Sequence, residues 1–364
     1  MAGVDPRIGR QLADIETPTL LLDRRACERN LLRMASFFKN RSAKLRPHFK
    51  NHKCVTLAKK QIAAGAVGMT CAKLGEAEVL VNHGFEDVLI ANQVVGTLKT
   101  ARLARLAKQA RVGAAIDCIE QAVAISKAAA AESATVNLLV EVDIGMGRCG
   151  VPPGASVLKL VKDLADLANI RFAGLQAYEG HLVNVLDRAE RTARALSAMR
   201  LAVETRNIIE AAGIPVPCIS GSSSATYDST GAMPGVDEIQ AGTYATMDKQ
   251  YQQLVPEFEI ALSVLVRVIS RPAHQKAVID VGVKGAGCEF GVPGIKDHPE
   301  VDIPFFLAEE HCVILGCPEW KVGQWLQLIP THACTTCNLY RELVVHEDER
   351  VVEVWPIEAS GRLT

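Results

Sequence analysis

The chain has 364 residues, of which 49% are hydrophobic and 5% aromatic, enough for one large domain or for a barrel and a smaller domain. Its 40 Lys and Arg residues against 41 Asp and Glu leave a formal charge of -1, which excludes the basic, aromatic-rich surface typical of nucleic-acid-binding proteins. No apolar run reaches the roughly 18 residues that a membrane span requires, and the N-terminal segment lacks the apolar core of a secretory signal. Eleven cysteines without framework spacing indicate reduced thiols, so we expect a cytoplasmic protein.

Strand-like segments alternate with amphipathic helical segments through the first two thirds of the chain. The expected strands are 19–23, 43–49, 67–72, 87–92, 112–118, 136–144, 171–178 and 216–221. Several of them are apolar throughout, as is typical of parallel strands buried on both faces. The pattern predicts a (β/α)8 barrel over residues 14–250, with a doubly wound sheet as the competing fold.

The segment LRPHFKNHK, at residues 45–53, concentrates basic side chains directly after the second expected strand. In a barrel, the carboxyl ends of the strands carry the chemistry, and Lys50 lies one residue past this strand. An amine desolvated there, with Arg46 and His48 nearby, favours its neutral form, and neutral amines form imines with aldehydes. Lys50 is therefore a candidate Schiff-base residue, although a solvated basic loop would have the same composition.

The segment GMGRCG, at residues 145–150, follows a strand and matches the glycine pattern of a dinucleotide-binding loop. Glu179, at the end of the next strand, could serve as the acid that binds the ribose. However, Pro152 and Pro153 follow at once, so no helix opens on the last glycine, and the match lies in the sixth strand rather than the first. We therefore interpret this segment as a loop with another role.

Two later segments have the composition of a phosphate site, which in barrels usually follows strands seven and eight. The chain reads SGSSSAT from residue 220 and AGTYA from residue 241, and small residues let backbone amides approach an anion while hydroxyls donate to it. The candidate contacts are Ser220, Gly221, Ser222, Gly242, Thr243 and Tyr244. A Ser-rich surface turn is the alternative. Tyr178, at the end of the seventh strand, is expected to line the barrel mouth, as a site residue or as an ordinary barrel-end aromatic.

After residue 250 the helical pattern gives way to strand-like runs, which predict an all-β domain over 251–364 together with part of 1–13. Within it, HACTTC places His332 and Cys334 two residues apart. On an extended segment these side chains would project from the same face and could hold one ion, although an isolated H-x-C is weak evidence for a metal. Cys334 and Cys337 also mimic a redox pair, but no second C-x-x-C completes a zinc ribbon.

Taken together, these motifs resemble those of the D-threonine aldolase and D-serine dehydratase family. The basic segment is similar to the R-P-H-x-K-x-H-K segment of that family. The resemblance extends over nearly the whole chain, through TPTLLLD, GMTCAKLGEAEVL, VEVDIGMGRCGV, FAGLQAYEGH, EIQAGTYATMD, IDVGVKG, EEH and HACTTCNL. Members of this family use pyridoxal 5'-phosphate and share the fold of alanine racemase, a barrel followed by a β domain.

The resemblance implies that Lys50 holds the cofactor and that Arg148 faces its ring near the pyridine nitrogen. An always-charged guanidinium there would leave that nitrogen unprotonated and temper the ring as an electron sink. The alternative for Arg148 is an ion pair without cofactor contact. The family usually has a triple glycine where this chain reads Ser-Gly-Ser-Ser from Ser220, which leaves the individual phosphate contacts open.

The resemblance also implies a metal at His332 and the residue two positions after it. D-threonine aldolases typically have Asp at that second position and D-serine dehydratases have Cys, and this chain has Cys334. A thiolate with an imidazole favours zinc over magnesium or manganese. Glu310 and His311 resemble the acidic residue and histidine that lie near this metal in the family, or they form a solvated loop.

Cys334 favours a dehydratase that converts D-serine, D-threonine or D-3-hydroxyaspartate to a 2-oxo acid and ammonia. In that reaction Lys50 takes the α-proton and the metal polarises the β-hydroxyl. In D-threonine aldolase-type cleavage, which gives glycine and an aldehyde, a base such as His181 takes the hydroxyl proton instead. We thus take Lys50, Tyr178 and His181 as candidate catalytic residues.

Two further functions are considered. A non-catalytic pyridoxal-phosphate carrier would lack the β-rich third of the chain and the H-x-C motif, and a metal-free amino acid racemase is a weaker possibility. Relatives with this fold commonly dimerise, so we expect a homodimer that binds a small D-amino acid and neither nucleic acid nor a membrane.

Overall fold

The computed structural model describes residues 5–364, which divide into two compact units. The barrel unit consists of Met34–Lys50, Ala58–Gly242 and Arg362–Thr364. The β unit consists of the described residues of Met1–Arg33, with Asn51–Leu57 and Thr243–Gly361. Residues 1–4, which belong to the segment 1–13 expected to join the β domain, lie outside the described residues.

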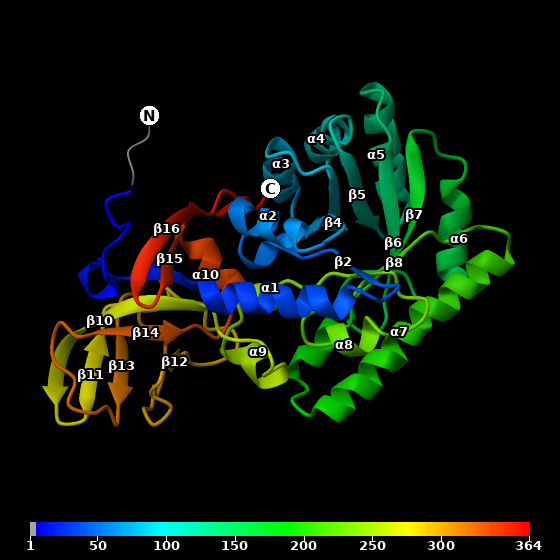
Figure 1. Ribbon diagram of the computed structural model, residues 1–364. Coiled ribbons are helices and arrows are strands. Elements are labelled where there is room, and N and C mark those ends of the chain that lie inside the picture. Colours follow the sequence, from blue (N-terminus) through cyan, green and yellow to red (C-terminus); the bar gives the residue numbers. More distant parts are fainter. Residues whose placement is uncertain (1–4) are drawn as a thin grey trace. The chain divides into compact units, whose positions relative to one another are not determined.

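The barrel unit contains a closed sheet of parallel strands (Figure 1). Its strands are β2 (Lys44–Leu45), β3 (Met69–Cys71), β4 (Asp87–Gln93), β5 (Arg111–Ile116), β6 (Val136–Val142), β7 (Ile170–Ala177), β8 (Ile219–Gly221) and β9 (Glu238–Ile239). Their order is β2-β9-β8-β7-β6-β5-β4-β3, and each neighbouring pair is parallel. A bridge between His48 and Thr70 joins the two end strands, so the sheet closes into the predicted (β/α)8 barrel.

Helices follow most of the barrel strands, because the intervening segments carry apolar residues at helical spacing. They are α2 (Val55–Ala63), α3 (Leu74–Asn82), α4 (Thr97–Ala107), α5 (Ile119–Ala131), α6 (Ala155–Leu164), α7 (Arg188–Ala211) and α8 (Tyr227–Thr230). Helix α7 begins where the Asp187 carboxylate accepts a hydrogen bond from the Glu190 amide at 2.7 Å. Every residue of β6 is buried, as expected for a strand covered on both faces.

One strand expected in the barrel lies in the other sheet. Strand β1 (Thr19–Asp23) pairs with β10 (Leu262–Ala273) and β15 (Glu342–Glu347), and the eighth barrel position is taken by β9. The apolar run in β1 indicates a buried strand but not its partners, and β9 is only two residues long, which is too short to show any periodicity.

The β unit is built on a mixed sheet, in agreement with the β-rich pattern of its sequence (Figure 1). Its further strands are β11 (Lys276–Ile279), β12 (Gly294–Ile295), β13 (Cys312–Leu315), β14 (Trp325–Ile329) and β16 (Arg350–Pro356). The chain also forms the helices α1 (Arg24–Phe38), α9 (Lys249–Leu254) and α10 (Ala333–Leu339). Helix α10 was not predicted, because its seven residues span fewer than two repeats of a helical pattern.

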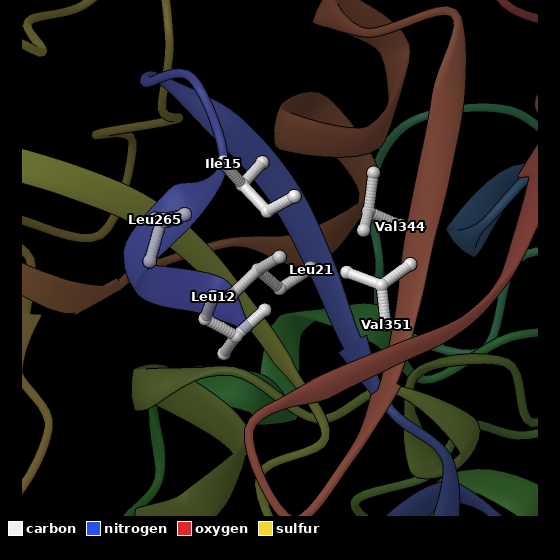
Figure 2. Packing of buried hydrophobic residues seen from close by; sticks show 6 residues of the cluster. All are labelled: Leu12, Ile15, Leu21, Leu265, Val344 and Val351. Carbon is white, nitrogen blue, oxygen red and sulfur yellow. The ribbon is translucent and has the colours of Figure 1, made fainter. Parts of the chain in front are cut away.

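A compact apolar cluster holds the N-terminal segment against this sheet. Figure 2 shows its members, which come from the N-terminal turn, β1, β10, β15 and β16: Leu12, Ile15, Leu21, Leu265, Val344 and Val351. Each is at most 2% exposed, and full burial of such a side chain contributes roughly 1.5–3 kcal/mol. Residues far apart in the sequence thus share one core.

Two further expectations concern the chain as a whole. Among residues 5–364, no helix combines the length and apolar character needed to cross a membrane. The eleven cysteines, all within the described residues, form no disulfide.

Candidate active site

Lys50 lies in the short 3-10 turn Phe49–Asn51, just after the point where His48 bridges to Thr70. Its side chain is half-buried, and its Nζ lies 6.0 Å from the centre of the Tyr178 ring. Tyr178 directly follows β7, so both residues occupy carboxyl ends of barrel strands, where barrels carry their chemistry. The structure therefore brings two of the predicted site residues together.

Arg148 contacts the same aromatic ring. Its guanidinium carbon lies 5.6 Å from the centre of the Tyr178 ring, and its Nη2 lies 3.8 Å from Glu141 Oε1. The glycine loop that carries Arg148 is folded by Asp143, whose Oδ1 accepts hydrogen bonds from the amides of Gly145 and Gly147 at 3.0 and 3.1 Å. Helix α6 begins only at residue 155, so no helix opens on the last glycine of the loop, as predicted.

Glu141 is a site residue that sequence reasoning missed. Its carboxylate is 5% exposed and accepts hydrogen bonds from Gln93 Nε2 at 2.7 Å and Gln176 Nε2 at 3.2 Å. Burial raises the pKa of Glu141, whereas the bond from Gln93 and the charge of Arg148 oppose that rise. Glu141 is the acid of the otherwise mostly apolar strand β6, and an acid in such a strand could have indicated a functional position.

His181 lies in the 3-10 segment Gly180–Asn184 and packs against the glycine loop, since a Cβ on Gly145 would lie 3.3 Å from its Cε1. Its Nδ1 is buried and has no hydrogen-bond partner among the described residues. Burial and the charge of Arg194 lower the pKa of His181, partly offset by Asp143. A neutral imidazole with an unused nitrogen can accept a proton at neutral pH.

The hydroxyls of the Ser-rich loop after β8 form hydrogen bonds within the barrel unit. Ser220 Oγ accepts a hydrogen bond from Gln240 Nε2 at 2.9 Å, and Ser222 Oγ bonds to the hydroxyls of Thr226 and Thr230 at 3.0 and 2.6 Å. These hydroxyls are engaged inside the barrel unit, which leaves backbone amides as the donors for an anion. A Cβ on Gly221 would lie 1.6 Å from the Ala177 carbonyl oxygen, so only glycine fits there.

A buried acid, Glu179, supports this loop. It is 1% exposed, and its Oε1 accepts a hydrogen bond from Thr226 Oγ1 at 2.6 Å, whereas its Oε2 has no partner among the described residues. Burial raises the pKa of Glu179. The sequence motif suggested a ribose-binding acid at this position, but the side chain instead bonds beneath the Ser-rich loop.

The second candidate phosphate segment divides between the units. Gly242 ends its part of the barrel unit, and Thr243 and Tyr244 form a 3-10 turn of the β unit. The Tyr244 side chain is 1% exposed, and its ring centre lies 6.0 Å from that of Phe258. This tyrosine is thus packed in the core of the β unit.

In the β unit, His332 and Cys334 lie at the beginning of helix α10 rather than on an extended segment. His332 is the N-cap residue with extended backbone angles, and Cys334 lies in the first turn. Their side chains nevertheless hydrogen-bond to each other. His332 Nδ1 lies 3.1 Å from Glu289 Oε1, and its ring centre lies 5.1 Å from that of Phe290.

Acidic groups surround this histidine. Burial alone would lower the pKa of His332, but Cys334, Asp248 and Glu289 raise it to about 9. Asp248 is fully buried and holds the local backbone, because its carboxylate accepts hydrogen bonds from the Tyr251 and Ala333 amides at 2.8 and 2.9 Å. Asp248 caps helix α9, a role that an Asp before a helical segment could have indicated.

The donor set suits a borderline-soft divalent ion. Glu289 holds Nδ1 of His332, which leaves Nε2 as the nitrogen for a metal, and a carboxylate behind a ligating histidine is typical of zinc sites. Among residues 5–364, no group of three or more His, Cys, Asp or Glu side chains could hold a metal, so the chain offers His332 and Cys334 as a pair. Glu310 and His311 are exposed, and Glu310 pairs with Lys284 at 2.9 Å. Cys337 is buried.

Comparisons with known proteins agree with the motifs. The model of the alanine racemase N-terminal domain matches residues 22–250, and that of a serine dehydratase domain matches residues 261–346. A D-threonine aldolase of Arthrobacter is 36% identical over 97% of this chain and 95% of its own length. A D-threo-3-hydroxyaspartate dehydratase of Delftia is 28% identical over 89% of this chain and 92% of its own length.

A solved structure is similar over the whole chain as well. The crystal structure of the D-threonine aldolase of Filomicrobium marinum superposes with a TM-score of 0.95 at 37% identity, over 98% of this chain and 99% of that one. The fold, the motifs and these relatives lead to one conclusion. This chain belongs to the D-threonine aldolase and D-serine dehydratase family of pyridoxal-phosphate-dependent lyases that act on D-hydroxy amino acids, with the alanine racemase-like fold.

Proposed function

We propose that this protein is a metal-dependent aldolase that cleaves D-3-hydroxy amino acids to glycine and an aldehyde. The relatives with the higher identity are aldolases, which supports this reaction over dehydration. The observation that carries the proposal is His181, because cleavage of the Cα–Cβ bond requires a base for the β-hydroxyl proton. Its lowered pKa keeps the imidazole neutral, as a base at neutral pH requires.

On the barrel side, Lys50 would hold pyridoxal phosphate, with Tyr178 and Arg148 beside it. When bound, this cofactor stabilises negative charge at the α-carbon of an amino acid. The protonated amine of Lys50 would donate a proton to the α-carbon after the Cα–Cβ bond breaks, and the proton that His181 takes from the hydroxyl balances it. The backbone amides of the loop after Gly221 would donate to the phosphate group, while Gly221 itself is required by the close approach of the Ala177 backbone.

On the β side, His332 and Cys334 would bind a divalent metal, zinc in the first instance. Two protein ligands leave open positions, and a Lewis acid at a substrate hydroxyl lowers the pKa of that hydroxyl. His181 then needs only modest basicity to remove the proton. We therefore propose two functional domains, a cofactor-binding one over 14–250 and a metal-binding one over 251–364 with part of 1–13. The compact units differ from these bounds, because 14–33, 51–57 and 243–250 lie in the β unit.

Dehydration to a 2-oxo acid and ammonia is the second candidate. One observation favours it: Cys334, and not an aspartate, lies beside His332. In that reaction the same metal would promote loss of the hydroxyl instead of its deprotonation. The cysteines bear on the location of the protein. We propose that the protein acts in the cytoplasm, a reducing compartment, because its eleven cysteines form no disulfide.

A product assay distinguishes the two reactions. The purified protein is incubated with D-threonine, D-3-hydroxyaspartate and D-serine, with added zinc, and glycine, aldehyde, 2-oxo acid and ammonia are each quantified. We expect glycine and aldehyde in equal amounts from D-threonine. Ammonia and 2-oxo acid without glycine would contradict the aldolase and establish the dehydratase, and L-isomers alone would contradict both.

A further inference from the structure

The side chain of Asn51 links the candidate metal cysteine to a fixed point of the β unit. Asn51 Nδ2 donates a hydrogen bond to Cys334 Sγ at 3.7 Å, which is a normal length for a bond to sulfur. Its Oδ1 accepts a hydrogen bond from Thr246 Oγ1 at 2.8 Å. Asn51 is 1% exposed, and Thr246 is fully buried. The amide therefore lies in a dry environment with one partner at each end.

The two hydrogen bonds go with one orientation of the Asn51 amide. The Thr246 hydroxyl donates to Oδ1, which places Oδ1 on the threonine side and Nδ2 on the cysteine side. An alternative acceptor for this hydroxyl, the Thr243 carbonyl oxygen, is 3.5 Å away and hence weaker. The amide thus presents an N–H group, and not an oxygen, to Cys334.

A donor in that position can orient the sulfur of a cysteine ligand. Hydrogen bonds to ligating groups orient them and tune their donor strength. We propose that Asn51 is a positioning residue of the metal site, whose amide N–H orients the Cys334 sulfur for the ion. This inference rests on the proposed function, since it requires that His332 and Cys334 bind a metal.

The place of Asn51 in the chain adds to its role. It directly follows Lys50, and in the segment R-P-H-x-K-x-H-K it occupies one of the two variable positions. The residue that would hold the cofactor and the residue that orients the metal cysteine are thus joined by one peptide bond. A change at position 51 alters the metal site without altering any motif residue.

The test measures metal binding directly, by zinc competition with a chromophoric chelator and by the sulfur-to-metal absorbance of the Co²⁺-loaded protein. For Asn51→Ala we expect zinc affinity to fall by about 10- to 100-fold, as is typical when a supporting hydrogen bond is lost, and the Co²⁺–thiolate band to shift. Thr246→Val leaves the amide in place but removes its orienting partner, so its loss of affinity should be smaller.

Asn30→Ala is the matched control. Asn30 is also 1% exposed and in the β unit, but its amide bonds to the backbone of Glu259 and not, within residues 5–364, to a candidate metal ligand. We expect this variant to lose stability and keep the zinc affinity and the Co²⁺ band of the parent. Equal zinc affinity and an unshifted band in Asn51→Ala would overturn the inference. If Cys334→Ser binds zinc like the parent, the proposed metal site itself is wrong, and the inference falls with it.

Discussion

Replacing Arg46 with methionine removes the cation that neutralises two carboxylates inside the barrel unit. The guanidinium donates to both oxygens of Glu238 at 2.8 and 2.7 Å and to Asp87 Oδ1 at 2.8 Å. The Arg46 side chain is 6% exposed, and those of Glu238 and Asp87 are 16% and 25% exposed. Arg46 belongs to the basic segment that contains Lys50, yet its contacts make it a structural residue.

The structure sets the size of the effect. Breaking a buried ion pair by removing one partner costs about 3–5 kcal/mol, because the other charge stays buried without compensation. Asp87 is exposed enough to regain water, so most of the cost falls on Glu238. We therefore expect Arg46→Met to lower the free energy of unfolding at pH 7 by about 3 kcal/mol, which is roughly a hundredfold in the folding equilibrium.

The effect also depends on pH. Burial raises the pKa of Glu238, but its bonds and charge interaction with Arg46 hold the pKa below the ordinary value. The stabilisation from this pair is therefore complete above the unfolded pKa of the carboxyl and is lost as the pH falls through the folded pKa. In Arg46→Met the buried Glu238 carboxyl takes up a proton more readily. The difference in unfolding free energy between the variant and the parent should therefore become smaller as the pH falls from 7 to 5.

Urea unfolding followed by far-ultraviolet circular dichroism is the assay, because all three tryptophans, Trp320, Trp325 and Trp355, lie in the β unit and would not report on the barrel. Arg29→Met is the control, since Arg29 bonds to both oxygens of Glu259 at 2.6 Å but is 54% exposed. Exposed ion pairs contribute little to the free energy of unfolding, so this variant should lose little stability. If both variants lose the same small amount of unfolding free energy at pH 7, the Arg46–Glu238 pair does not contribute as a buried ion pair should.

Four further outcomes are expected. Lys50→Ala should lose the cofactor absorbance at about 410–420 nm, and a retained band would exclude this lysine as its attachment point. Cys334→Ala should keep that absorbance band and lose metal-dependent turnover. If the parent keeps full activity after exhaustive chelation, the reaction does not require a metal. His181→Gln should reduce kcat for cleavage by roughly 10²- to 10⁴-fold. Because burial lowers the pKa of His181 below the ordinary histidine value of 6.5, kcat of the parent should stay constant as the pH falls to 6.5 and decline only below it. Sedimentation should show a homodimer, and monomer alone at working concentrations would contradict that expectation.

The barrel itself could be predicted from the sequence, but the membership of one strand could not. Alternation of strand and helix patterns predicted seven of its strands near their observed positions, because buried parallel strands are apolar and their helices amphipathic. Strand β1 has the same apolar character, yet it pairs with β10 and β15. Local patterns report burial, whereas strand partners are set by contacts distant in the sequence.

Part of the candidate site was predictable from motifs. Lys50, Arg148 and Tyr178 lie near one another, as the motifs indicated. The contacts of Glu141 with Gln93 and of Asn51 with Cys334 were missed, because the partners lie far apart in the sequence and only the folded chain shows them.

The most direct test of this account is chemical reduction of the holoenzyme with borohydride, followed by proteolysis and mass mapping of the modified peptide. We predict that the reduced pyridoxyl group is found on Lys50, in the peptide that spans LRPHFKNHK. A pyridoxyl group on another lysine, or on none, would contradict the assignment of the cofactor lysine and the chemistry derived from it.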